Sequence, residues 1–388
     1  MNMNRICYLC SAIFWLLVSC QEAVEHKDVI LFTGTESSPV IRFSVDQASS
    51  IGFTVSATGK VTADTKVSVA VVPELLDSYN KSNDKAFALL PKESYELDMN
   101  ETVIKAGKNV SEAFRLSITS LDKIEEGIKY CIPISITGTD GDMPILEPSR
   151  TVYVVISRPV VTKVMDLGSG TAFNAPRFIT DERVSDLRAV TMEARVRMNE
   201  WYNGNPYIST VMGIEENYLL RFGDISLMRG DLLQMGPAKI GDKKTFLTTN
   251  SGFQLDTWYH IASVYNGSTL SLYINGKLDA SVTIDGGGSI NMNDDYCDGF
   301  WIGKSAQMGR YLNGAISEVR VWNRALSPGE LEENACFVDP KSPGLLAYWR
   351  FNELQDDGVT IRDVTGNGFD LKRMGRTWKW IEDVKCPE

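Results

Sequence analysis

The feature that most constrains this fold is an alternating pattern of apolar and polar residues over residues 258–282, which two Asn-Gly pairs interrupt. Successive side chains of a β-strand point to opposite faces, so this alternation is typical of strands with one buried face. Asn266-Gly267 and Asn275-Gly276 separate the runs. Asn-Gly favours type I′ turns, which need positive φ at both central residues. The segment therefore predicts three antiparallel strands joined by two tight hairpins.

Short alternating runs recur along most of the chain. In the N-terminal part they lie near Val67, Tyr130 and Thr151, with turn residues between them. Strands at this spacing are typical of an antiparallel sandwich. Residues 73–91 are an exception, and we expect a helical turn there.

A second β-rich region follows Pro159, with longer strands and glycine-rich corners. We expect strands at residues 191–198 and 344–353. Ser327, followed directly by Pro and three residues later by Glu, predicts the N-cap of a short helix that ends near Asn334. The sequence therefore predicts an all-β chain with two sandwiches in series.

The first 20 residues have the form of an export signal. Arg5 precedes an uncharged apolar run that is shorter than the roughly 20 residues needed to span a bilayer. Residues 17–20, Leu-Val-Ser-Cys, resemble a bacterial lipobox, in which lipid is attached to the cysteine thiol. We expect a signal peptide over residues 1–19, lipid on Cys20 and a tether over residues 20–28. The alternative is an ordinary signal peptide followed by an incidental cysteine.

Three stretches of the C-terminal part carry a family pattern: residues 257–280, 300–334 and 345–371. The middle stretch is the most specific, with I-x-E-V-R-V-W-N-x-A-L-S ahead of an acidic helix. Together they resemble a laminin G-like, concanavalin A-like jelly roll. In many relatives the last stretch opens the domain, whereas here it closes the chain. The resemblance implies a jelly-roll sandwich within residues 159–388.

Residues 75–83, 88–108 and 127–138 are similar to an Ig-like domain that begins many surface lipoproteins of glycan-foraging bacteria. This resemblance implies an Ig-like sandwich over residues 29–158. The two resemblances together imply a surface lipoprotein of a polysaccharide-utilisation system. Fatty acids such as palmitate would hold it in the outer membrane, where it would face the cell exterior. The resemblances also imply an outer-membrane transporter and glycosidases as partners.

The charge and the cysteine spacing argue against nucleic-acid binding and against a cysteine metal site. The chain has a net charge of −11 and no basic blocks of the kind that bind nucleic acid, so we expect no nucleic-acid partner. The cysteines beyond Cys20 match no metal-binding spacing. Export permits a disulfide between Cys336 and Cys386, but we expect buried free thiols.

Few residues suit catalysis. His26 lies in the tether, and His260 occupies a strand position expected to be packed. Glycoside hydrolysis needs only two carboxylates, but no strand carries the E-x-D-x-x-E pattern that directs several acids into one cleft. Glu193 and Glu318 each stand alone in a strand, which favours structural acids or a solvated face. We therefore expect a protein that is not an enzyme.

Sugar-binding sites pair exposed aromatic rings with planar polar groups. Residues 200–210 are rich in Gly, Asn and Pro, which mark a loop that cannot easily bury three rings. The alternative is that one or two rings cap the edge of the sandwich. The candidate ligand-binding residues of this loop are Trp201, Tyr202, Asn203, Asn205 and Tyr207.

Two other loops are weaker candidates, and an ordinary solvated turn is the alternative for each. The loop of residues 291–299 carries Tyr296, and another carries Arg310 and Tyr311. Tryptophans within apolar strand patterns are expected in the core: Trp258, Trp301, Trp322 and Trp349. Trp378 and Trp380 share one strand face, which is more typical of core than of a ligand platform.

A structural calcium ion is the one cofactor that the resemblance suggests. Asp363 and Asn367 offer hard oxygen ligands on a glycine-bent loop, which Ca²⁺ prefers. The alternative is an Asx-stabilised turn without an ion, and the acidic loop of residues 294–298 is another candidate.

The sequence thus favours a surface lipoprotein that captures an extracellular polysaccharide or oligosaccharide without cleaving it. Two alternatives stay open: a glycoside hydrolase with an unrecognised carboxylate pair, and an adhesion or assembly module that binds protein.

Overall fold

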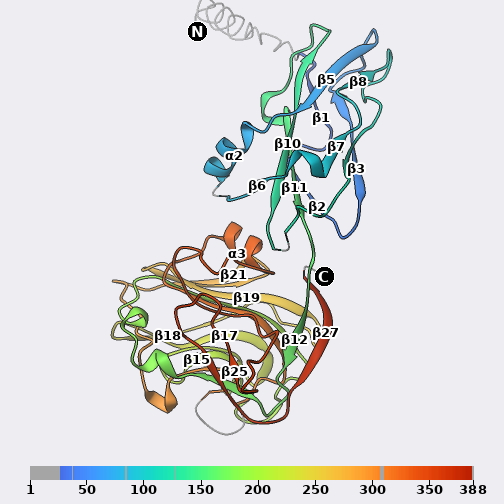
Figure 1. Ribbon diagram of the computed structural model, residues 1–388. Helices are drawn as coiled ribbons and strands as arrows, with labels where there is room; N and C mark the ends of the chain where they lie inside the picture. Colours follow the sequence, from blue (N-terminus) through green and yellow to red (C-terminus); the bar gives the residue numbers. More distant parts are fainter. Residues whose placement is uncertain (1–26, 37, 84, 126, 306–309, 387–388) are drawn as a thin grey trace, which may run out of the picture.

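The computed structural model describes residues 27–386 apart from 37, 84, 126 and 306–309. Cys20 and His26 therefore lie outside the described residues. Two β-rich bodies stack end to end and meet at a narrow junction (Figure 1). Strand β11 (Thr151–Ser157) ends the first body, and β12 (Val160–Asp166) begins the second. The prediction of an all-β chain is confirmed.

The N-terminal body is an Ig-like sandwich. Its main sheet has the order β2-β11-β10-β5-β8, with β6 beside β10, and a smaller sheet has the order β3-β9-β7. Alternate side chains of these strands, such as Val67, Ile132 and Val154, form the core. The remaining strands are β1 (Ile30–Phe32), β2 (Val40–Ser44), β3 (Ser49–Phe53), β4 (Val55–Ala57), β5 (Thr65–Val71), β6 (Ala88–Leu89), β7 (Tyr95–Leu97), β8 (Glu101–Ile104), β9 (Phe114–Ile118) and β10 (Tyr130–Thr139).

Helix α2 (Leu75–Asn83) confirms the helical turn predicted within residues 73–91. Leu76 of α2 packs with Phe87, Cys131 and Val155, so the helix covers the outer face of the main sheet. Burial raises the pKa of the free Cys131 thiol to about 12, which keeps this cysteine protonated.

The C-terminal body is a jelly-roll sandwich of two antiparallel sheets. One has the order β21-β20-β19-β14-β23-β12-β27, with β24 beside β23, and the other has the order β18-β17-β16-β15-β22-β13-β26-β25. Its strands are β13 (Ala172–Ala175), β14 (Val190–Met198), β15 (Ser209–Ile214), β16 (Tyr218–Asp224), β17 (Arg229–Ile240), β18 (Lys243–Thr248), β19 (Trp258–Tyr265), β20 (Thr269–Ile274), β21 (Lys277–Thr283), β22 (Phe300–Ile302), β23 (Gly314–Trp322), β24 (Leu345–Trp349), β25 (Thr360–Ile361), β26 (Leu371–Met374) and β27 (Lys379–Cys386).

The core of this sandwich follows from the two-residue period of its strands. Met192, Ala194 and Val196 of β14 point inward and pack between the sheets. Residues of the opposite parity in β14, such as Glu193, point to the outer face. The closing strand β27 pairs with β12, so the end of the chain lies beside the first strand of the domain. Strand β27 is therefore an edge strand of the sheet that contains β14.

The two hairpins predicted for residues 258–282 are confirmed, because β19 pairs with β20 and β20 pairs with β21. Asn275 and Gly276 both have positive φ, 51° and 76°, as type I′ requires. At the first turn only Gly267 has positive φ, 99°, so the type I′ prediction was wrong there. The side chain of Asn266 instead accepts hydrogen bonds from the backbone N–H of Ser268 and Thr269, which stabilises a different turn.

Helix α3 (Pro328–Asn334) confirms the predicted helix start. Ser327 Oγ accepts a hydrogen bond from the Glu330 N–H over 3.2 Å, and Glu330 Oε2 accepts one from the Ser327 N–H over 2.8 Å. This capping box satisfies two backbone donors that a helix end otherwise leaves unpaired. The helix lies over the outer face of the sheet that contains β14, on the side of the junction (Figure 1).

Cys336 and Cys386 form a disulfide, so the prediction of free thiols at these positions was wrong. Cys336 follows α3 and Cys386 ends β27, and the fold brings their Cα atoms to 5.4 Å although 50 residues separate them in sequence. Spacing along the chain could not show this approach, because it depends on α3 lying beside the end of the last strand. Cys131 and Cys297 are free, and only Cys131 is fully buried.

A cluster of opposite charges joins the two bodies. The Glu333 carboxylate, in the last turn of α3, pairs with Lys129 and lies 3.5 Å from Lys85 Nζ and 3.5 Å from Arg42 Nη2 of the N-terminal sandwich. The ring of Phe337 packs against Gly127, where a side chain would collide with it. These contacts hold the C-terminal sandwich in one orientation below the N-terminal one.

Candidate functional site

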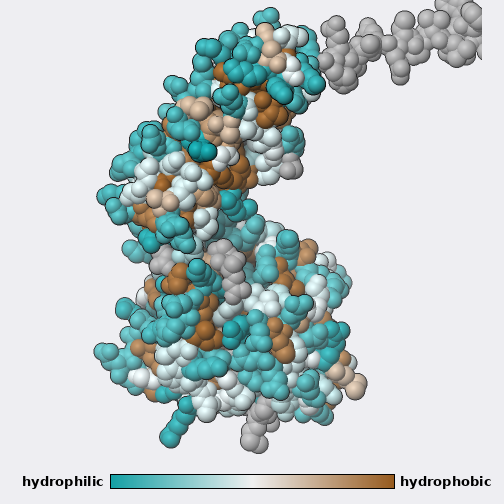
Figure 2. All heavy atoms as spheres, turned by 90° about the vertical axis from the view of Figure 1, so that its right-hand side faces the viewer, coloured by the Kyte–Doolittle hydropathy of each residue, from teal (hydrophilic) through white to brown (hydrophobic). Residues whose placement is uncertain are grey.

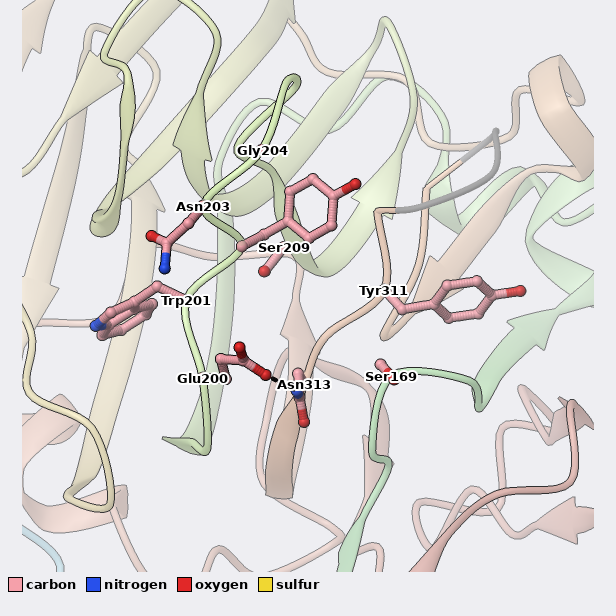
Figure 3. A pocket seen from close by; sticks show the side chains of 9 residues that line it. Ser169, Glu200, Trp201, Asn203, Gly204, Ser209, Tyr311 and Asn313 are labelled. Atoms are coloured by element: carbon pink, nitrogen blue, oxygen red, sulfur yellow. Dashed lines mark hydrogen bonds between the residues drawn. The ribbon is translucent and has the colours of Figure 1, made fainter.

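The best candidate for a functional site is a hollow of about 400 Å³ at the end of the C-terminal sandwich. Its lining comes from the loop after β14, the turn after β12, the start of β15 and the segment that leads into β23 (Figure 3). These segments are far apart in sequence, and only the strand order brings them together. The described lining residues are Ser169, Glu200, Trp201, Tyr202, Asn203, Gly204, Ser209, Tyr311 and Asn313.

The hollow lies at the end of the domain that faces away from the N-terminal sandwich. Strand β12 begins at Val160, directly after the junction, and runs to Asp166. Seven strand residues span about 20 Å, so Ser169 lies roughly that far from the junction. Figure 1 shows β12 running in this direction, away from the first body.

On the aromatic side of the hollow, the loop that carries Trp201 lies close to the backbone of β17. The Trp201 ring packs on the Phe222 ring with centroids 5.4 Å apart, so one side of it is held by the core. A Cβ at Gly230 would lie 3.2 Å from the Trp201 Cβ, and glycine there lets the loop rest against β17. Tyr202 is 39% exposed. One ring is therefore anchored while the next remains open to solvent.

The polar side of the hollow is held by side-chain amides. Asn313 Nδ2 donates a hydrogen bond to Glu200 Oε2 over 3.3 Å, drawn as the dashed line in Figure 3. Behind it, Asn199 Nδ2 donates to both carboxylate oxygens of Asp166, each over 3.0 Å. Asp166 is 1% exposed, so this network fixes the ends of β12, β14 and β23 relative to one another.

Four of the sequence-predicted binding residues meet at this hollow: Trp201, Tyr202, Asn203 and Tyr311. Tyr311 comes from a different predicted loop, so the fold joins two candidates that the sequence kept apart. The structure also adds Ser169, Glu200, Ser209 and Asn313. Glu200 and Ser209 lie inside the predicted loop of residues 200–210, and Asn313 lies in the loop that carries Tyr311, so only Ser169 had no sequence signal.

The other predicted residues lie outside the lining of the hollow. Arg310 is held in an ion pair, with its Nη1 2.6 Å from Glu215 Oε1. The Tyr207 carbonyl packs against Gly223, where a side chain could not fit, and Tyr207 has φ of 61°. Asn205 is exposed beside them. Tyr296 is 51% exposed on a separate loop, so the structure does not bring it to the hollow.

Two family models match the sequence. One covers residues 170–332 and describes the concanavalin A-like lectin/glucanases superfamily, and the other covers residues 26–143 and describes an N-terminal domain. The C-terminal sandwich therefore has a concanavalin A-like, laminin G-like fold, and the match covers residues 170–332 of it. No functionally curated protein matches the chain.

One solved structure has a similar fold, and two others match more weakly. A Bacteroides ovatus protein, described provisionally as carbohydrate-binding, has a TM-score of 0.56 at 23% identity, over 92% of this chain and 99% of its own. The carbohydrate-binding module of a Ruminococcus gnavus sialidase, bound to sialyllactose, has a TM-score of 0.35 at 15% identity, over 45% and 98%. A two-domain Bacteroides fragilis protein of unknown function has 0.30 at 11%, over 81% and 98%. The Bacteroides ovatus protein therefore shares the fold of this chain.

Glu193 and Glu318 of the concanavalin A-like domain are structural acids. Glu193 accepts hydrogen bonds from Arg320 and from Trp322 Nε1, and its Oε2 lies 2.8 Å from His260 Nε2. Arg320 also donates to Glu318 over 2.8 Å. Burial alone would raise the pKa of Glu193, but the Arg320 charge and the His260 contact hold it below its ordinary value. His260 is buried, as predicted.

The tryptophans of this domain divide into two groups. Trp301, Trp322 and Trp349 are buried, as predicted. Trp258 is only half-buried, because it lies on the outer face of its sheet beneath the guanidinium of Arg195, 4.7 Å from the ring centroid. The core prediction was therefore wrong for Trp258. Because α3 covers part of the outer face of this sheet, apolar residues occur at outward positions of the strand as well as at inward ones. The sequence pattern therefore could not tell on which face Trp258 lies.

The predicted calcium ligands, Asp363 and Asn367, make hydrogen bonds that hold a turn. Asp363 Oδ1 accepts hydrogen bonds from the N–H groups of Tyr348 and Thr365 and from the Thr365 hydroxyl, and its Oδ2 accepts one from the Phe369 N–H. Asn367 Nδ2 donates to two backbone carbonyls. The four donors around Asp363 fit the Asx-turn alternative. In the other candidate loop, Asp294 binds the amide of Asn217 and a backbone N–H.

Proposed function

We propose that this chain binds an extracellular carbohydrate in the Trp201 hollow and does not cleave it. The observation that carries the proposal is the pairing of Trp201, Tyr202 and Tyr311 with hydroxyl, amide and carboxylate groups in one open hollow. Aromatic faces pack on the C–H faces of sugars, and planar polar groups pair with their hydroxyls. A volume of about 400 Å³ lies within the usual range for small-ligand sites.

The carboxylate content of the hollow supports binding without hydrolysis. Glycosidases use two carboxyl groups roughly 5–10 Å apart. Among the nine described lining residues, Glu200 alone carries a carboxylate, and it accepts the Asn313 hydrogen bond. A lone acid can orient a hydroxyl group, but it cannot supply both the acid and the base or nucleophile.

We further propose that lipid on Cys20 holds the protein in the outer membrane, as part of a polysaccharide-utilisation system. The lipobox resemblance and the polar tether support the anchor. In the described part of the chain, no helix is long and apolar enough to cross a bilayer. The N-terminal sandwich acts as a spacer, and the hollow at the far end of the second domain presents captured glycan to a transporter and to glycosidases.

Affinity electrophoresis against a panel of polysaccharides tests the binding site. We expect retardation of the wild-type protein by at least one glycan, and its loss in Trp201→Ala and Tyr202→Ala. Phe246→Ala is the matched control, because Phe246 is 55% exposed on β18, outside the hollow. Equal retardation of all four proteins would refute the site.

Two further measurements separate the alternatives. Release of reducing ends from a retarded glycan would show a glycosidase. A glycan array without binding, together with a protein captured in pull-down, would show an adhesion module. For the anchor, Cys20→Ser should abolish labelling by a palmitate analogue and release the protein from membranes.

A further inference from the structure

A strongly basic segment borders the hollow. Residues 372–379, Lys-Arg-Met-Gly-Arg-Thr-Trp-Lys, contain four cations and no carboxylate, in a chain whose net charge is −11. The segment links β26 to β27, and Arg376 and Lys379 are exposed. Such a local reversal of charge attracts anionic ligands to one part of an otherwise acidic surface.

The segment is continuous with the hollow. Thr377 packs against the Gly168–Gly170 turn, because a Cβ at Gly170 would lie 2.5 Å from the Thr377 hydroxyl. That turn carries Ser169, which lines the hollow. Lys379 Nζ lies 3.5 Å from Asp166 Oδ2, in the network behind Asn313. A chain-like ligand that leaves the hollow past Ser169 would therefore meet the basic segment next.

Aromatic rings lie within the same strip. Trp378 and Trp380 are half-buried and contact each other edge to face, with centroids 5.2 Å apart. The Arg373 guanidinium lies 5.5 Å from the Trp378 centroid, and Lys163 Nζ lies 4.8 Å from that of Trp380. The rings pack on the core from one side, which confirms part of their predicted role. Their position also places sugar-stacking surface beside fixed positive charge.

Not every cation of the strip is neutralised within the protein. Lys372 pairs with Asp357 over 3.4 Å. Neither Arg373 nor Arg376 has an ion-pair partner among the residues that the structure describes. The carboxylates of β27, Glu382 and Asp383, follow Lys379 by about 10 Å or more along the strand, toward the junction. Figure 2 faces the side that carries β12 and β27 and shows hydrophilic residues interspersed with hydrophobic ones on this domain.

We infer that the ligand of this site is an anionic polysaccharide, whose carboxylate or sulfate groups are bound by Arg373, Arg376 and Lys379 while its sugar rings occupy the hollow and the Trp378 face. The inference rests on the proposed function, because it extends the same site. Guanidinium groups bind carboxylate and sulfate oxygens through two parallel hydrogen bonds, which amides cannot reproduce at equal strength.

The test compares three probes by affinity electrophoresis at 50 and 300 mM NaCl: polygalacturonate, chondroitin sulfate and neutral amylopectin. We expect retardation by at least one of the two anionic probes, weaker at the higher salt, and about tenfold weaker in the Arg373→Gln/Arg376→Gln double variant. The control double variant is Lys239→Gln/Lys277→Gln, which removes two exposed cations of the same domain far from the strip. Circular dichroism confirms that each variant is folded.

The outcomes distinguish two hypotheses: that the hollow binds a glycan, and that this glycan is anionic. If Trp201→Ala abolishes binding but the arginine variant binds the anionic probes as tightly as wild type, the inference is overturned and the proposed function stands. Binding of amylopectin alone has the same meaning. Equal retardation by a DNA duplex would show a general polyanion surface and also overturn the inference. Absence of binding to any glycan would overturn both.

Discussion

Asn313 donates a hydrogen bond to Glu200 over 3.3 Å, and this contact joins the segment that enters β23 to the segment that leaves β14. The two residues are 113 positions apart in sequence. Their contact orients the only carboxylate among the described lining residues of the hollow. The contact forms because β14 and β23 are adjacent strands, so the strand order determines the shape of the site.

This contact predicts how two substitutions differ. Glu200→Gln keeps an oxygen that can accept from Asn313, so we expect glycan affinity within about threefold of wild type. Asn313→Ala leaves Glu200 unheld, and we expect affinity to fall about fivefold to tenfold, as for the loss of one hydrogen bond of roughly 1 kcal/mol. Isothermal titration with a retarded glycan measures both. A larger loss in Glu200→Gln than in Asn313→Ala would contradict this account.

The Cys336–Cys386 disulfide closes a long loop, because 50 residues separate the two cysteines. Loop closure restricts the unfolded chain, so Cys336→Ser/Cys386→Ser should lower the free energy of unfolding by about 2–4 kcal/mol. Denaturant unfolding followed by tryptophan fluorescence measures the change. Cys297→Ser is the control, since Cys297 is free and half-buried. An equal midpoint for the double variant and the control would refute the prediction.

The charge cluster at the junction should make stability depend on pH. Burial alone would raise the pKa of Glu333, but Lys129, Lys85 and Arg42 hold it below the ordinary value of 4.5. A lowered pKa stabilises the folded state above about pH 4.5, and the contribution is lost as pH falls through the folded pKa. Glu333→Gln should therefore cost about 1–3 kcal/mol at pH 7 and much less at pH 3.

Urea unfolding at both pH values provides this test, and Glu332→Gln is a matched neighbour. The Glu332 side chain is 57% exposed, whereas that of Glu333 is 14% exposed. We expect the Glu332 variant to unfold like wild type at both pH values. A pH-independent difference for Glu333→Gln would show that its charge does not contribute.

Asp363 predicts the outcome of metal removal. Its two oxygens accept four hydrogen bonds from the chain, and a cation would have to displace them. We expect a chelator to leave the melting temperature within about 1 °C, whereas Asp363→Ala should lower stability by about 1–3 kcal/mol, because buried N–H groups lose their acceptor. Differential scanning fluorimetry with EDTA and with added Ca²⁺ gives the answer. A rise in melting temperature with Ca²⁺ would contradict this expectation and support the calcium prediction.

Local sequence determined much of this architecture. The alternation around two Asn-Gly pairs predicted β19, β20 and β21, and the Ser327 cap predicted α3, because hairpins and helix ends depend on residues that are neighbours in sequence. The aromatic loop at Trp201 was also visible, since Gly, Asn and Pro mark a loop wherever it lies. The same reasoning failed at Asn266, where side-chain hydrogen bonds select another turn.

Tertiary structure alone decided which distant residues meet. Ser169, Trp201, Tyr311 and Asn313 share one hollow because β12, β14 and β23 are neighbours in a sheet, although Asn313 is 113 positions from Glu200 in sequence. The disulfide and the burial of Glu193 have the same origin. Each depends on α3 covering one face of that sheet, and such long-range contacts leave no periodic signal in the sequence.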